Sequence, residues 1–379
     1  MQIFHNLNVD WLGKRKIFYA VSTSLFLIGV ISVIIRGFHF GIDFKGGTEI
    51  VMQFQKPVSI DRVRNYVENI GLGNLELKTF GGETGILIRS EAQNIPHSIF
   101  PKVVGNINNE IQSIYPGLPF QIVDSSANTV TYALPNPDTT NLLVEKLFAK
   151  GFQTSKASEE LNNSRMVVSV SISDWIKDNL KKQMPDNPFK ILKEDHVGPK
   201  VGNELKVQAL LSIFLSLLGI LIYLAFRFKF IFAAGAVVAL FHDTLITIGL
   251  YAALYGIIPG LNLEIDLTVI GAFLTLIGYS VNDTVIVFDR VRESMKIHKT
   301  MPVEEVINLS VNKTMSRTIL TGSTVLLAVL VLLIFGGEVL RAFAFTLFFG
   351  TIIGTYSSIF VASALVVEYV NYSKKKIEF

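Results

Sequence analysis

The sequence has no cysteine among its 379 residues, which excludes disulfide bonds, thiolate metal sites and cysteine nucleophiles. The net charge is only +3, and no basic patch with interleaved aromatic residues indicates nucleic-acid binding. Metal-ligand spacings, a nucleophile elbow and a phosphate-binding loop are also missing from the sequence. We therefore expect a protein that is not an enzyme, without metal or cofactor, and without a nucleic-acid partner.

Apolar residues are what the chain has in excess. Hydrophobic residues make up 50% of the chain and charged residues 17%, and the mean hydropathy is +0.46. A chain this apolar must segregate its hydrophobic residues into membrane spans. Because about 20 mostly apolar residues cross a bilayer, the long runs predict six transmembrane α-helices. One precedes a polar region of about 170 residues, and five follow it.

The first apolar run follows a basic segment, as a signal peptide would. It is too long for a signal-peptide core, and no small-residue cleavage site follows at Arg36, so we interpret it as a retained helix. The predicted spans are 17–36, 206–226, 230–251, 266–288, 319–335 and 342–367. The remaining predicted segments are a cytoplasmic N-terminus at 1–16, a cytoplasmic connector at 289–317 and a cytoplasmic tail at 368–379.

The distribution of lysine and arginine orients these helices. The N-terminus, the turn at 227–229, the connector and the lysine tail are basic and fall on one side of the membrane. The positive-inside rule places that side, with both termini, in the cytoplasm. Residues 37–205 then form a large extracytoplasmic domain between the first and second helices.

The pattern of this domain predicts an α+β fold. The order strand, helix, strand, strand is expected over 48–89, with Ser59 as the helix N-cap, and it recurs about 80 residues later over 129–171. Two such units predict a duplicated β-α-β-β arrangement with helices on one face of antiparallel sheet. Gly46 and Gly47, which precede the first strand, are interpreted as a hinge at the entry to the domain.

One carboxylate inside a predicted helix calls for an explanation. Asp283 lies within the fourth span, where insertion scales assign a charged residue a cost of about 2.5–3.5 kcal/mol. Arg317 begins the fifth span at a comparable depth, so a pair is geometrically reasonable. Burial favours a neutral Asp283, whereas a nearby arginine favours the ionised form. The alternative is that Asp283 only pairs helices together.

Other polar residues accompany these two. Asn282 adjoins Asp283, and Thr321 belongs to a polar stripe at helical spacing that comprises Thr314, Arg317, Thr318, Thr321 and Thr324. The threonines could line a hydrated face or only bond their own helix backbone. His242 and Asp243, nearer mid-membrane, could extend a proton relay or form a structural pair. The small residues at 350–354 indicate helix packing.

Several motifs together resemble the SecF family of the bacterial SecDF complex. In sequence order they are GIDFKGG at 41–47, VGP at 197–199, FHD at 241–243, GYSVNDT at 278–284, FDRVRE at 288–293, SRT at 316–318, FGGEVLR at 335–341 and GTYSS at 354–358. They cover the membrane part and both ends of the external domain.

The resemblance implies a member of the resistance–nodulation–division superfamily in the bacterial plasma (inner) membrane. Such a subunit uses the proton-motive force with SecD to help complete pre-protein translocation through SecYEG. In this family the residues tied to proton transport match Asp283 and Arg317. The external domain is longer than the resemblance implies, and residues 92–172 are interpreted as an insertion. Met1 indicates a separate subunit, although half of a fused SecD–SecF chain would look almost the same.

Two other functions fit the same pattern of residues. A small-molecule or lipid exporter of the same superfamily would need a substrate cleft in or near the external domain. A non-transporting scaffold of the translocon would need the helix packing but not the ionisable residues.

Overall fold

The computed structural model describes residues 7–73, 75–92, 94–126, 128–158, 164–258 and 261–373. Within it the chain divides into two compact units. The membrane unit comprises Met1–Asp43 and Glu204–Phe379, and the α+β unit is Phe44–Asn203. The lysine tail at 374–376, which the sequence assigns to the cytoplasm, lies outside the described residues.

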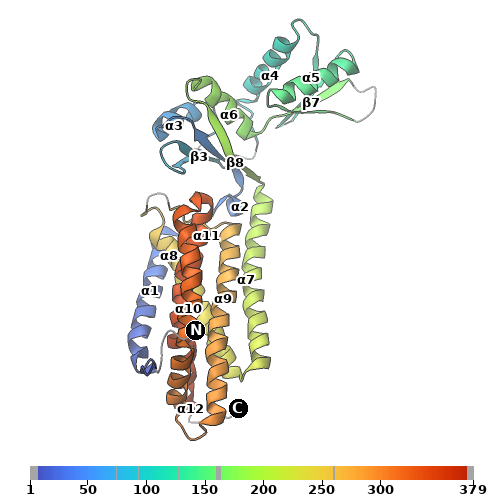
Figure 1. The fold of residues 1–379 in the computed structure, drawn as a ribbon. Coiled ribbons are helices and arrows are strands. Elements are labelled where there is room, and N and C mark those ends of the chain that lie inside the picture. The colour runs from blue at the N-terminus through green and yellow to red at the C-terminus, as the bar shows by residue number, and fades with distance from the viewer. Residues whose placement is uncertain are drawn as a thin grey trace. The chain divides into compact units, whose positions relative to one another are not determined.

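Among the residues that the structure describes, six helices of the membrane unit are long and apolar enough to cross a membrane (Figure 1). The first comprises a short 3-10 turn, η1 (Leu12–Lys14), and α1 (Arg15–Arg36). The next four are α7 (Pro199–Arg227), α8 (Phe230–Leu254), α9 (Leu267–Ile297) and α10 (Val303–Phe335). The sixth runs through α11 (Gly337–Ser357), the π-helical segment η2 (Ser358–Ser363) and α12 (Ala364–Ser373). The predicted fold class is therefore confirmed.

Glycine lets these helices approach closely at two crossings. Where α1 crosses α8, a Cβ at Gly29 would lie 2.9 Å from the Cα of Gly249. Where α11 crosses α9, a Cβ at Gly350 would collide with the side chain of Leu276. The small residues at 350–354 thus do pack helices together, and they bring α11 against the helix that carries Asp283.

The connector between the fourth and fifth spans is helical at both ends. Helix α9 continues to Ile297, and α10 begins at Val303 behind Pro302, whose fixed φ suits a helix start. The segment beginning at Val303, within the predicted connector, is therefore the first part of α10 and is continuous with the fifth span.

Within its described residues the α+β unit contains two four-stranded sheets, in which neighbouring strands pair antiparallel. The first sheet has the order β2-β3-β1-β8, with β1 (Gly47–Phe54), β2 (Leu75–Thr79), β3 (Gly85–Ser90) and β8 (Phe189–Val197). The second has the order β4-β5-β7-β6, with β4 (Gln121–Ser126), β5 (Thr129–Ala133), β6 (Gln153–Lys156) and β7 (Arg165–Ser169).

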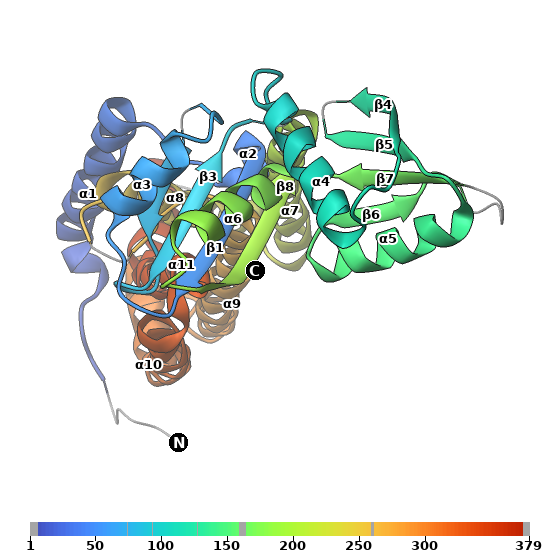
Figure 2. The ribbon, with the colours of Figure 1, turned by 90° about the horizontal axis from the view of Figure 1, so that it is seen from above.

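Helices accompany each sheet (Figure 2). They are α2 (Ile42–Lys45) before β1, α3 (Ile60–Glu68) and α6 (Ile172–Gln183) with the first sheet, and α4 (Phe100–Ile114) and α5 (Pro137–Ala149) with the second. Apolar residues at helical spacing on these helices, such as Val63 and Val67, bury against alternate strand residues such as Ile50 and Met52. Ser59 precedes α3 as expected, but its side chain donates and accepts no capping hydrogen bond.

The two sheets show the predicted duplication with one difference in chain order. The segments β1-α3-β2-β3 and β5-α5-β6-β7 match, and each outer strand beside the first strand, β8 or β4, is preceded by a helix, α6 or α4. In the second half the outer helix and strand come before the repeat, whereas in the first half they come after it. Strand β4 was not expected, because all six of its residues are exposed and none shows a burial pattern.

Candidate functional site

Two carboxylates are buried among the helices of the membrane unit, together with hydroxyl side chains that form a polar cluster around them. Asp243 is the more deeply buried of the two, with 1% of its surface exposed. It lies on α8. Its Oδ2 accepts hydrogen bonds from Ser280 Oγ of α9 at 2.7 Å and from Ser357 Oγ of α11 at 2.9 Å. Its Oδ1 lies 2.9 Å from Nδ1 of His242. Three donors from three helices thus surround a group that, when ionised, only accepts hydrogen bonds.

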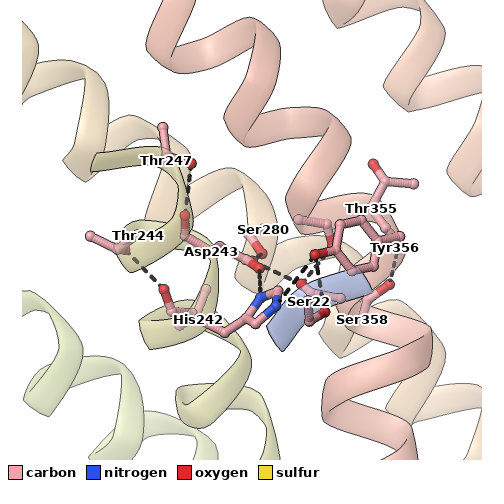
Figure 3. Close-up of polar contacts among 12 residues, drawn as sticks. Ser22, His242, Asp243, Thr244, Thr247, Ser280, Thr355, Tyr356 and Ser358 are labelled. Atoms are coloured by element: carbon pink, nitrogen blue, oxygen red, sulfur yellow. Dashed lines mark hydrogen bonds and ion pairs between the residues drawn. The ribbon is translucent and has the colours of Figure 1, made fainter. Parts of the chain in front are cut away.

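His242 extends this cluster to the first helix (Figure 3). Its Nε2 lies 3.3 Å from the Tyr356 hydroxyl, which in turn lies 3.2 Å from Ser22 Oγ on α1. If His242 donates from Nδ1 to Asp243, Nε2 is left to accept from Tyr356, and that hydroxyl can accept from Ser22. The side chains of Ser22, Tyr356, His242 and Asp243 therefore form one continuous hydrogen-bonded chain.

Asp283 lies on α9 with 7% of its surface exposed. Its Oδ1 accepts from Thr318 Oγ1 of α10 at 2.7 Å, and its Oδ2 accepts from Ser358 Oγ at 3.3 Å. It has fewer donors than Asp243, and one of its two bonds is long. Fewer hydrogen bonds therefore hold the side chain of Asp283 in place than hold that of Asp243.

One helix contacts both carboxylates. Ser357 is the last residue of α11 and Ser358 the first of η2, and they bond Asp243 and Asp283 respectively. Ser363 Oγ donates to the carbonyl of Ser358 at 2.9 Å, within the π-helical turn. Such π-turns inside α-helices occur frequently at functional sites.

Gly354 leaves the space that this arrangement needs. A Cβ at Gly354 would lie 2.9 Å from Ser280 Oγ and 3.4 Å from Asp243 Oδ2. Any larger residue would push α11 away from α9 and from the Asp243 carboxylate. The position indicated by sequence as a packing site is therefore also part of the polar cluster.

The predicted partner of Asp283 lies elsewhere. Among the described residues no ion pair within 4.0 Å joins Asp283 and Arg317, and Arg317 is exposed on α10. Thr318, the next residue, makes the bond instead. Thr321 is exposed and donates to the carbonyl of Arg317, its own helix, and Asn282 is exposed on α9.

Gly46 and Gly47 lie outside this cluster, at the start of β1. Both have positive φ, 76° and 124°, which favours glycine. A Cβ at Gly47 would collide with the carbonyl oxygen of Ser90 on β3, so this backbone is fixed against the sheet.

Sequence reasoning brought Asp283, His242 and Asp243 into the site but missed Ser22, Tyr356, Ser357 and Ser358. Serine and tyrosine inside apolar runs cost little and are common, so the GTYSS motif at 354–358 contributed to the family resemblance without indicating contacts to the carboxylates. Within the described residues no group of three or more histidine or acidic side chains could hold a metal ion.

The fold and this cluster define a multi-pass membrane protein with two buried carboxylates, each hydrogen-bonded to hydroxyl groups of neighbouring helices. A family described as "Protein export membrane protein SecD/SecF, C-terminal" matches residues 176–372, and the "SecD/SecF GG Motif" matches residues 31–58. The protein translocase subunit SecF of Rhodothermus marinus is 39% identical over 368 residues, which cover 97% of this chain and 95% of that protein. SecF of Koribacter versatilis is 35% identical, covering 97% and 93%.

A solved structure shares the fold. The crystal structure of SecDF from Thermus thermophilus, a translocon-associated membrane protein, superposes with a TM-score of 0.62 at 28% identity. It covers 97% of this chain, and this chain covers 39% of that longer one. The chain therefore belongs to the SecF family of protein translocase subunits.

Proposed function

We propose that this chain, together with SecD, uses the proton-motive force to promote late steps of pre-protein translocation through SecYEG. In this proposal it lies in a bacterial plasma membrane with both termini in the cytoplasm and the α+β unit outside. The observation that carries the proposal is the pair of buried carboxylates, Asp243 and Asp283, held by adjacent serines of one membrane helix. Buried ionisable residues in membrane helices mark proton and ion pathways.

Asp283 is the proposed proton-carrying group. Its carboxylate is held by two hydroxyl groups, and Arg317, the residue directly before Thr318, lies exposed on α10. The carboxyl then alternates as the helices open to one side and the other. A proton moving down 100 mV supplies about 2.3 kcal/mol, enough to bias a domain motion but not to pull a chain unaided. The external unit would therefore bind and release a translocating segment over repeated cycles.

The chain Ser22–Tyr356–His242–Asp243 is proposed as the relay beside it. Histidine and hydroxyl groups both accept and donate protons, and the four side chains connect α1 with α8 through unbroken hydrogen bonds. Arg317 and Thr321 remain the proposed polar face of α10.

Export of a secreted reporter in cells tests the proposal. Asp283→Asn is expected to abolish the proton-dependent part of export, and Arg317→Ala to reduce it strongly. A translocon scaffold without transport would leave both variants silent while Gly354→Leu, which disrupts packing, would not. A small-molecule exporter would instead show flux of a small substrate in the purified complex, which our proposal does not include.

A further inference from the structure

We propose that residues 39–43 form a junction that couples the two carboxylate-bearing helices to the first connection of the α+β unit, with Asp43 as its positioning residue. This inference rests on the proposed function, since it describes how the proton site would reach the external unit. The residues that form the junction, and the helix ends they contact, all lie in the membrane unit.

The start of the junction is fixed to α8. Arg36, at the end of α1, donates to the carbonyl oxygens of Ala253 at 3.3 Å and Tyr255 at 3.2 Å, at the end of α8. The His39 ring then stacks on the Tyr255 ring, with centroids 3.6 Å apart and planes within 5°. Earlier along α1, the helix also packs closely against α8 at Gly29 and Gly249. The chain leaving α1 therefore follows the end of the helix that carries Asp243.

The end of the junction is fixed to α9. Phe40 and Ile265 form a parallel bridge, in which Gly41 N donates to Ile265 O and Ile265 N donates to His39 O, both at 2.8 Å. Asp43 Oδ2 then accepts from the backbone N–H of Leu267, the first residue of α9, at 2.9 Å. A free N–H at a helix start needs such an acceptor. This bond ties the GIDFKGG motif directly to the helix that carries Asp283.

Stiff helices can carry a displacement over the distance involved. Helix α9 is unbroken from Leu267 to Ile297, so Asp283 lies about 24 Å along its axis from Leu267. Along α8, Asp243 lies about 16 Å from Leu254. Because residues 39–43 are held by both helix ends, any shift of α9 relative to α8 must move this segment. It continues through Gly46 and Gly47 into β1.

Three variants test Asp43 with matched chemistry. Asp43→Ala removes the bond to Leu267, whereas Asp43→Asn keeps an acceptor oxygen there. Asp266→Ala is the control, because Asp266 Oδ1 caps the same helix end by accepting from Val269 N but leaves the bond to the linker intact. Proton flux is measured in proteoliposomes of the complex with SecD, and export in inverted membrane vesicles.

We expect Asp43→Ala to keep proton flux within twofold of the parent while proton-dependent export falls at least fivefold. Asp43→Asn should restore export, and Asp266→Ala should export like the parent. Unchanged export in Asp43→Ala overturns the proposal. So does an equal loss of flux and export, or an equal loss in Asp266→Ala, since either would indicate only a structural role.

A cross-link tests the junction without reference to protons. The chain has no native cysteine, so a pair introduced by Phe40→Cys and Ile265→Cys is the only thiol pair. Neighbouring strands lie about 5 Å apart, within the Cα–Cα range for a disulfide. If the bridge between residues 40 and 265 stays formed throughout the export cycle, the oxidised variant should export as well as the reduced one. Loss of export on oxidation, reversed by reductant, overturns the proposal.

The two experiments separate this inference from the function beneath it. If the parent complex moves no protons, the proposed function fails, and the cross-link still decides whether the junction must remain closed for export. If the parent moves protons and Asp43→Ala exports normally, the function stands and the junction fails.

Discussion

Ser357 and Ser358 are consecutive residues that donate hydrogen bonds to two different membrane carboxylates, Asp243 and Asp283. Consecutive side chains on an α-helix point about 100° apart, so this helix sits between α8 and α9 with one hydroxyl toward each. A change at either carboxylate is therefore felt by the same turn of helix. At that turn α11 passes into the π-helical segment η2, which begins at Ser358 and whose hydrogen bonding departs from the α-helical pattern.

Thr318 is predicted to be the most important hydroxyl at Asp283. Thr318→Val keeps the shape but removes the donor of the 2.7 Å bond. Hydrogen bonds to charged groups contribute about 1.5–3 kcal/mol, so proton-driven export should fall about tenfold or more. Thr318→Ser should recover most of it. Thr324→Val is the control, because exposed Thr324 donates to its own helix at the carbonyl of Thr321. Equal export rates in Thr318→Val and Thr324→Val would contradict this role.

Tyr356 is predicted to link α1 to His242. Tyr356→Phe keeps the ring, which packs beside Phe18, but removes the hydroxyl between Ser22 and His242. Proton flux in proteoliposomes should fall several-fold if these side chains carry protons. The control is Tyr223→Phe on the exposed face of α7. Unaltered proton flux in Tyr356→Phe would contradict the proposed relay and indicate that His242 and Asp243 form only a structural pair.

Gly354 is predicted to be intolerant of even one added methyl group. In Gly354→Ala the new Cβ would lie 2.9 Å from Ser280 Oγ, and overpacking of this kind costs about 1–3 kcal/mol. Gly278→Ala on α9 is the matched control, because no neighbouring atom lies within 4 Å of its Cβ and alanine favours a helix by about 1 kcal/mol. Thermal unfolding in detergent should show a lower midpoint for the first variant and an equal or higher one for the second. The reverse order would exclude close packing at Gly354.

Asp178 is predicted to destabilise the α+β unit at neutral pH. Burial raises the pKa of its carboxyl above the usual 3.8, and the charges of Lys182 and Lys181 only partly oppose this. The folded state therefore binds the proton more tightly than the unfolded state, and stability falls as pH rises through the window between 3.8 and the raised pKa. Asp178→Asn should raise the unfolding temperature at pH 7 and lose this advantage below the window.

The fluorescence of Trp175 reports on that unfolding. Its indole is buried and donates to the carbonyl of Ile70 at 3.1 Å, and Trp11→Phe removes the other tryptophan signal. The account of Asp178 is wrong if Asp178→Asn lowers the unfolding temperature at pH 7, or if its advantage persists at low pH.

Much of this architecture could be predicted from sequence because bilayer spans and alternating strands leave strong periodic signals. The six helices and the repeated β-α-β-β order follow from such patterns. Strand β4 does not, since an exposed edge strand has no buried face to impose alternation. The pairing of β8 with β1, and the position of α6 with it, could not be predicted either, because long-range strand pairing leaves no local signal in the sequence.

The site was only partly predictable for a related reason. Asp283 and Asp243 stand out because a carboxylate in an apolar run is costly. Their hydroxyl partners cost little and look like ordinary membrane-helix residues, so the choice between Thr318 and the neighbouring Arg317 depends on helix rotation. Sequence spacing placed both near Asp283, and the packing of α9 on α10 decides which side chain reaches it.

The most direct test of the central claim is proton flux through the reconstituted complex with SecD, driven by an imposed pH gradient and membrane potential. Asp283→Asn is compared with Asn282→Ala, which changes the exposed neighbour on the same helix. We predict that Asp283→Asn removes both proton flux and the proton-dependent part of export, while Asn282→Ala keeps both. Full flux and export in Asp283→Asn would contradict the account.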